Sequence, residues 1–254
     1  ILNIKCVNAL NKTEQIRVFA KRNGFQFEVG KLNVYKNNIV KKAKIFIIPV
    51  SFDGGADTPK ILPNLVDVLK NKSFNQAIID VNVQIKKTMD VRKIINIAMQ
   101  RNPIIASSIM GRYSYLWLNK DNISSAMYLD FFSKFYTEYM DKNAKIDRGN
   151  SGNITYVFVT NRESFSGSEK TDKLDGEATL DQSSNELKWG DLCVIYKNGA
   201  KNCYTYLHEI GHTLGLEHSF DNIKYSKNKL TFRRGYTDNT LDYLSNDVIT
   251  KDRT

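Results

Sequence analysis

Alternation of apolar and polar residues predicts antiparallel β-structure in the first fifth of the chain. Asn23-Gly24 lies between two alternating segments and is a strong signal for a β-hairpin turn. Four strands are expected here: Gln15–Phe19, Phe25–Val29, Leu32–Tyr35 and Ala43–Val50. We therefore predict a small all-β module over residues 1–52, with its Phe and Ile side chains in a core. Three roles fit such a module: an accessory element, a targeting element or an extension of the following domain.

From residue 53 onward the pattern becomes mixed, which predicts a separate α+β domain over residues 53–254. Ser51–Pro59 has the composition of a loop and sets the boundary. Apolar residues at helical spacing predict helices over Ile61–Leu69 and Ser124–Met140. Strands are expected at Asn82–Ile85, Tyr113–Leu118, Ile154–Val159 and Leu192–Tyr196, with an edge strand at Gly176–Leu180.

The composition is that of an ordinary globular protein and excludes some classes of function. The chain has 254 residues, of which 41% are hydrophobic and 25% charged. No apolar run reaches the roughly 18 to 20 residues of a membrane span. The formal charge of +10 comes from scattered lysines, with no arginine-rich block or nucleic-acid motif, so we expect no nucleic-acid partner. Oligomeric state is left open.

The three cysteines, Cys6, Cys193 and Cys203, are too few and too widely spaced for a disulfide-dense scaffold. Cys193 and Cys203 flank the segment that leads into the histidine motif described next. A disulfide between them and a pair of buried thiols are both compatible with the sequence.

A histidine motif at residues 208–218 carries the chemistry. Its spacing is H-E-x-x-H-x-x-G-x-x-H, formed by His208, Glu209, His212, Gly215 and His218. Residues four apart share one face of a helix, so the first two histidines can bind one metal ion. The glycine can end the helix in a left-handed conformation and return the third histidine. Three nitrogen ligands with an open fourth position are typical of catalytic zinc, and all 3 histidines of the chain fall on these positions.

These residues resemble the motif of the metzincin zinc endopeptidases. The resemblance implies a metzincin-like α+β catalytic domain with a mixed twisted sheet, an active-site helix and a Met-turn-like loop. It also implies that His208, His212 and His218 bind one Zn²⁺ and that Glu209 is the general base. Zinc would activate a water for attack on the scissile peptide carbonyl. The implied protein is an exported peptide hydrolase with a protein or peptide substrate, bound along the edge strand.

The second landmark of the family is a tight turn built around a methionine. The segment Thr237–Tyr243 resembles this turn as it occurs in pappalysin-like and related bacterial members, although Leu241 stands in the methionine position. Tyr243 lies where several metzincin groups carry a tyrosine that approaches the metal, so it either assists the oxyanion or packs in the turn. Ser219, directly after the third histidine, resembles the matrixin group instead, and the subfamily is left open.

Two further hypotheses remain at this point. Asp172, Asp175 and Asp181 offer oxygen ligands for Ca²⁺, but their spacing matches no known calcium loop. A non-catalytic protein-binding module on a metalloprotease-like fold is the main alternative to a peptidase. An intact ligand set together with Glu209 favours the peptidase, because a decayed site would have lost one of these residues.

Overall fold

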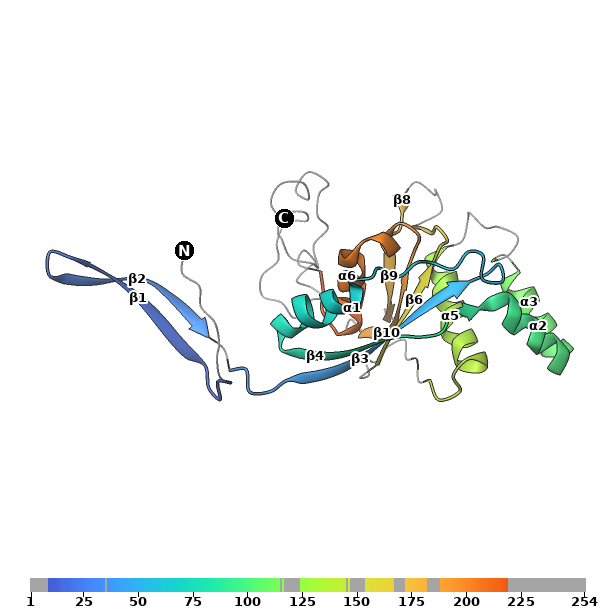
Figure 1. Cartoon of the computed structure of the whole chain (residues 1–254), viewed down its shortest axis with the longest axis horizontal. Helices are drawn as coiled ribbons and strands as arrows, with labels where there is room; N and C mark the ends of the chain where they lie inside the picture. Colours follow the sequence, from blue (N-terminus) through green and yellow to red (C-terminus); the bar gives the residue numbers. More distant parts are fainter. Residues whose placement is uncertain are drawn as a thin grey trace.

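The computed structural model describes residues 9–34, 36–114, 116, 124–144, 146, 154–166, 172–181 and 188–218 (Figure 1). Its centre is a mixed six-stranded sheet with the strand order β4-β3-β6-β10-β9, to which β5 is added beside β3. The strands are β3 (Lys41–Ser51), β4 (Ile79–Ile85), β5 (Met89–Asp90), β6 (Ile154–Thr160), β9 (Gly176–Asp181) and β10 (Lys188–Ile195). All neighbours are parallel except β9, which runs antiparallel to β10 at the edge of the sheet. The expected mixed sheet and its edge strand at Gly176 are confirmed.

The central strands are apolar on both faces because helices cover both sides of the sheet. Ile45, Ile47, Ile48 and Val50 of β3 are all fully buried, as are Val157, Phe158 and Val159 of β6. A continuous apolar run of this kind is typical of a strand inside a parallel sheet.

One face of the sheet is covered by α5 (Ser125–Tyr139). Its aromatic residues pack on the strands, and the ring of Phe132 stacks on Phe158 with centroids 4.9 Å apart. The predicted core-packing helix over Ser124–Met140 is confirmed. Between β5 and α5 lie two helices packed on each other, α2 (Val91–Arg101) and α3 (Pro103–Tyr113).

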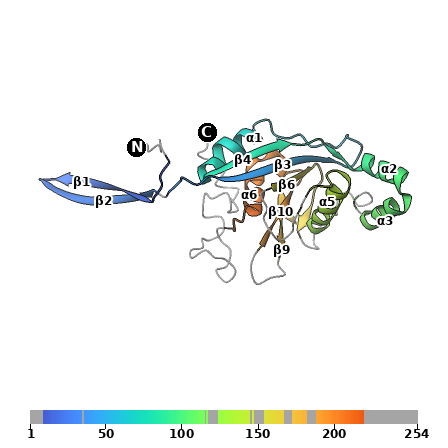
Figure 2. The ribbon, with the colours of Figure 1, turned by 90° about the horizontal axis from the view of Figure 1, so that it is seen from below.

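The other face carries α6 (Cys203–Thr213) together with the helical segment that follows β3. This segment consists of α1 (Leu65–Asp67), η1 (Val68–Ser73) and η2 (Phe74–Ala77). It starts four residues later than the predicted helix over Ile61–Leu69 and extends further. Tyr206 and Ile210 of α6 are fully buried against Val157, Cys193 and Ile195. Figure 2 shows α1 and α6 on the side of the sheet opposite to α5.

The predicted hairpin forms, but it lies apart from the sheet. Strands β1 (Glu14–Arg22) and β2 (Phe25–Val34) pair antiparallel, and Asn23 and Gly24 both have positive φ, as a type I′ turn requires. The hairpin extends away from the rest of the molecule in both views (Figures 1 and 2). Phe25, Phe27 and Val29 are 70%, 56% and 62% exposed, so the expectation of a buried face was wrong.

The boundary of the predicted all-β module also needs correction. Residues 41–51, which we assigned to that module, form β3 and pair parallel with β4 and β6 in the central sheet. Of the three strands described between residues 9 and 51, only β1 and β2 of the hairpin are therefore separate from the central sheet. The physical reason is that β3 is apolar on both faces, and a two-stranded module cannot cover both.

Two other segments differ from the predicted elements. The strand expected at Tyr113–Leu118 is wrong at its start, since Tyr113 is the last residue of α3 and Leu116 is helical. The helices α2 and α3 were not predicted at all. No helix in the described part of the chain is long and apolar enough to span a membrane.

Candidate metal centre

The helix α6 presents the histidine motif, and its two ends are both capped. Asn202 precedes the helix and its side chain accepts a hydrogen bond from the backbone N–H of Tyr204. At the other end Gly215 has φ = 89°, the left-handed conformation that favours glycine.

The turn after α6 is a Schellman motif that brings His218 back towards the helix. The N–H of Leu216 donates to the carbonyl of Gly211 at 3.0 Å, and that of Gly215 donates to the carbonyl of His212 at 2.8 Å. The predicted role of Gly215 as the residue that reverses the chain is confirmed.

The three histidines converge on one point, as the spacing predicts. The Nε2 atom of His212 lies 3.1 Å from Nε2 of His208 and 3.1 Å from Nε2 of His218. Two nitrogens bound to zinc at 2.0 to 2.1 Å with tetrahedral angles are about 3.3 Å apart. Among the described residues, these three form the group of His, Cys, Asp and Glu side chains that could hold a metal ion.

A backbone carbonyl fixes the tautomer of His212. The carbonyl oxygen of Leu216 lies 2.7 Å from Nδ1 and can only accept, so Nδ1–H is the donor and Nε2 carries the lone pair. Such an outer hydrogen bond is the usual support of a metal-binding histidine. The residues present therefore fit a zinc ion.

His212 is 2% exposed, and burial lowers its pKa to about 3. The neighbouring His208 acts in the same direction, while the hydrogen bond with Leu216 raises the pKa. At neutral pH the ring is uncharged, which is the form that binds a metal ion.

Glu209, the predicted general base, is buried between α6 and β9. Burial and the nearby Glu177 raise the pKa of its carboxyl to about 8, whereas a hydrogen bond from the backbone N–H of Ala178 lowers it. A dication held by the histidines would favour the ionised form, because opposite charges attract. A carboxylate in this environment can accept a proton near neutral pH.

A second carboxyl, that of the half-buried Glu177, lies on the other face of β9. It is opposite Val194, whose side chain belongs to the core beneath α5. Ser125 donates a hydrogen bond to the Glu177 side chain, but its Oε2 atom is buried without a hydrogen-bond partner among the described residues. Burial raises the pKa of Glu177, so ionisation of this group costs stability in the folded state.

We expect Glu177→Gln to raise the melting temperature at pH 8. The folded-state pKa lies above the unfolded one, so the group stabilises the fold at low pH and this contribution is lost as pH rises through the folded pKa. The gain of the variant should therefore be largest at high pH, shrink as pH falls through the folded pKa, and be absent below the ordinary glutamate pKa of 4.5. Thermal unfolding of wild type and variant at several pH values measures this difference. Asp80→Asn is the control, because Asp80 is an exposed carboxylate on β4. A melting temperature unchanged at pH 8 would contradict the prediction.

Several predicted site residues lie outside the described residues: Ser219, Leu241 and Tyr243. The assignments of Tyr243 and of the turn around Leu241 therefore stay predictions. The calcium hypothesis also stays untested, because the side chains of Asp172 and Asp181 are not described. Cys193 and Cys203 are free thiols in the structure.

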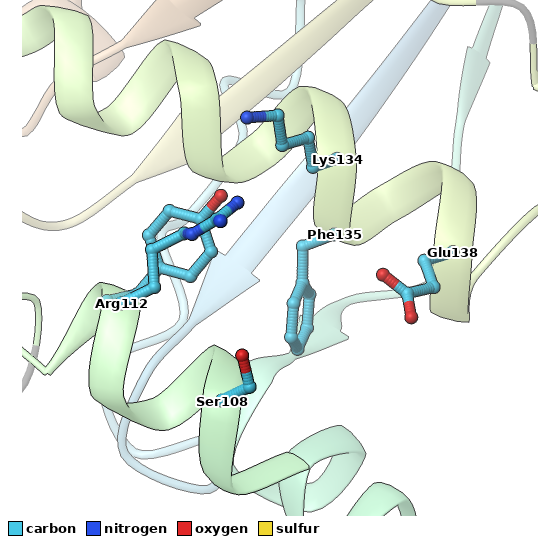
Figure 3. Close-up of a pocket in the computed structure, with 6 residues that line it drawn as sticks. Ser108, Arg112, Lys134, Phe135 and Glu138 are labelled. Atoms are coloured by element: carbon cyan, nitrogen blue, oxygen red, sulfur yellow. The ribbon is translucent and has the colours of Figure 1, made fainter. Parts of the chain in front are cut away.

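A pocket lies on the opposite side of the sheet from the histidines, between α3 and α5 (Figure 3). It is lined by Ser108, Arg112, Tyr113, Lys134, Phe135 and Glu138. Lys134 already pairs with Asp130 at 3.0 Å, and Arg112 and Glu138 bring opposite charges. The pocket holds none of the predicted site residues, and we assign no role to it.

No protein-family model, curated protein or solved structure matches this chain. The site is therefore interpreted from its own residues. The sequence pattern found the three histidines and Glu209, but not the backbone groups of Leu216 and Ala178 that hold His212 and Glu209. A carbonyl and an N–H belong to every residue, so no side-chain motif could reveal them.

Proposed function

We propose that the protein is a zinc-dependent endopeptidase of the metzincin type. The observation that carries the proposal is the convergence of His208, His212 and His218 beside a buried Glu209. The Nε2 atom of His212 lies 3.1 Å from Nε2 of each of the other two histidines. Three nitrogen ligands leave a fourth coordination position open, as in catalytic zinc sites.

Glu209 has the properties of the general base in this reaction. A bound zinc ion would supply a Lewis acid and lower the pKa of a water towards neutrality. Glu209 takes the proton as the water attacks the peptide carbonyl, and it returns this proton to the departing amine. One carboxylate therefore serves both halves of peptide-bond hydrolysis, and the water supplies the hydroxyl group of the new carboxylate product.

The edge strand β9 supports a peptide as the substrate. Among the described strands β9 has one partner, β10, and no described strand pairs with its other edge. Extended peptides bind such edges through backbone hydrogen bonds. The edge starts next to Glu209, so a peptide paired with it would pass close to the histidines.

We expect purified protein loaded with zinc to bind one equivalent and to cleave an unstructured protein such as casein. A chelator should stop cleavage, and added zinc should restore it. Metal analysis and gel-based cleavage with and without the chelator measure this. One equivalent of zinc without cleavage of casein or of a peptide library would favour the binding-module alternative. Well under one equivalent would overturn the metal site itself.

A further inference from the structure

We propose that Gly176, the first residue of β9, positions the Glu209 carboxylate by having no side chain. This inference rests on the proposed peptidase function. A Cβ atom at Gly176 would lie 2.7 Å from Cγ and 3.1 Å from Oε1 of Glu209. Real Cβ atoms essentially never approach a neighbouring atom below 3.0 Å, so a larger residue at this position would displace the side chain of Glu209.

Thr205, one helical turn before Glu209, is packed in the same way between two glycines. Its Cγ2 atom would lie 3.0 Å from a Cβ at Gly176 and 2.7 Å from a Cβ at Gly199. A Cβ at Gly199 would also clash with the backbone carbonyl of Asp175. No further atom therefore fits at the point where α6 contacts the start of β9 and the segment that precedes α6.

The close approach of β9 has a direct consequence for Glu209. The backbone N–H of Ala178, two residues along the strand, donates a hydrogen bond to the carboxylate. Gly176 provides the space and Ala178 the donor, so β9 holds the side chain of Glu209 at two points. A peptide paired with β9 is thereby aligned with the group that receives the proton.

The effect of Gly176 is steric, not conformational. Its φ is not positive, in contrast to Gly24, Gly54, Gly55 and Gly215. Alanine can therefore adopt the backbone conformation of Gly176, and a substitution tests the space alone.

We expect Gly176→Ala to retain one equivalent of zinc and an unchanged KM, while kcat falls roughly 10²-fold, as for a misplacement of about 1 Å. Gly111→Ala is the matched control, because a Cβ at Gly111 meets nothing within 4 Å. A wild-type kcat for Gly176→Ala in an otherwise active enzyme would overturn the inference and leave the proposed function standing.

A second measurement is independent of activity. Amide hydrogen exchange of Ala178, followed by NMR in the zinc-free protein, should be faster in Gly176→Ala and in Glu209→Ala than in the wild type. Faster exchange in both variants of a protein that cleaves nothing would support the positioning and refute the peptidase. Unchanged exchange in Glu209→Ala would overturn the inference even if Gly176→Ala failed to fold.

Discussion

Glu209→Gln should bind zinc like the wild type and lose peptide hydrolysis by a factor of about 10² to 10⁴. Glutamine has nearly the shape of glutamate, and its amide oxygen can still accept the hydrogen bond from Ala178. It cannot take up the proton of the attacking water. The variant thus separates proton transfer from metal binding and from packing.

The experiment compares zinc content and kcat/KM of Glu209→Gln with those of the wild type. Glu138→Gln makes the same chemical change at an exposed position of α5, on the opposite side of the sheet, and should keep full activity. Hydrolysis by Glu209→Gln at the wild-type rate would exclude Glu209 as the base. Loss of zinc together with activity would assign Glu209 a structural role instead.

The metal-binding residues could be predicted from the sequence because their geometry is local. His208 and His212 are one helical turn apart, and the turn at Gly215 returns His218 within six residues of His212. Eleven residues therefore determine the arrangement, with no need to know the rest of the fold. The surroundings of Glu209 depend on β9 and could not be found this way, since Gly176 is 33 positions earlier in the chain.

The error at β3 shows what the pattern did contain. Ala43–Val50 is an almost continuous apolar run, which is typical of a parallel strand covered on both faces. We grouped it with the neighbouring hairpin because the two are adjacent in the sequence. The burial of Ile45, Ile47 and Ile48 in the centre of the sheet follows from this run.

The hairpin shows what an alternating pattern cannot predict. Alternation in Phe25–Val29 correctly predicted a strand with one apolar face, but alternation does not say what covers that face. Here Phe25, Phe27 and Val29 are mostly exposed. A two-stranded hairpin is only marginally stable by itself, so the long pairing of β1 with β2 and the I′ turn at Asn23-Gly24 account for its form.

The helices missed by the sequence analysis had weaker signals. Asp90 caps α2 by accepting a hydrogen bond from the N–H of Lys93, which is a recognisable start signal. The end of α3 is harder to predict from the sequence, since polar and apolar residues alternate in Tyr113-Ser114-Tyr115-Leu116 as they do in a strand. Tyr113 is buried, and its hydroxyl donates to Asp130 of α5 at 3.0 Å, so tertiary contacts decide the structure there.

His212→Asn should abolish zinc binding and hydrolysis while the protein still folds. The Nδ2–H group of asparagine occupies nearly the place of Nδ1–H of histidine, so it can donate to the Leu216 carbonyl in the same way. The variant has no atom at the place of Nε2, which lies 3.1 Å from both His208 and His218. It therefore removes the central ligand without leaving a buried carbonyl unpaired.

The difference in zinc binding between His212→Asn and the wild type is measured as the zinc dependence of the melting temperature. A ligand that binds only the folded state stabilises it by about 4 kcal/mol at a free concentration 1,000 times its Kd. The wild-type melting temperature should rise with added zinc, and that of His212→Asn should not. Tyr204→Phe, on the same helix but outside the histidine group, should respond like the wild type. A zinc-dependent rise in His212→Asn equal to that of the wild type would mean that the ion binds elsewhere, and the three histidines would then lose their proposed role.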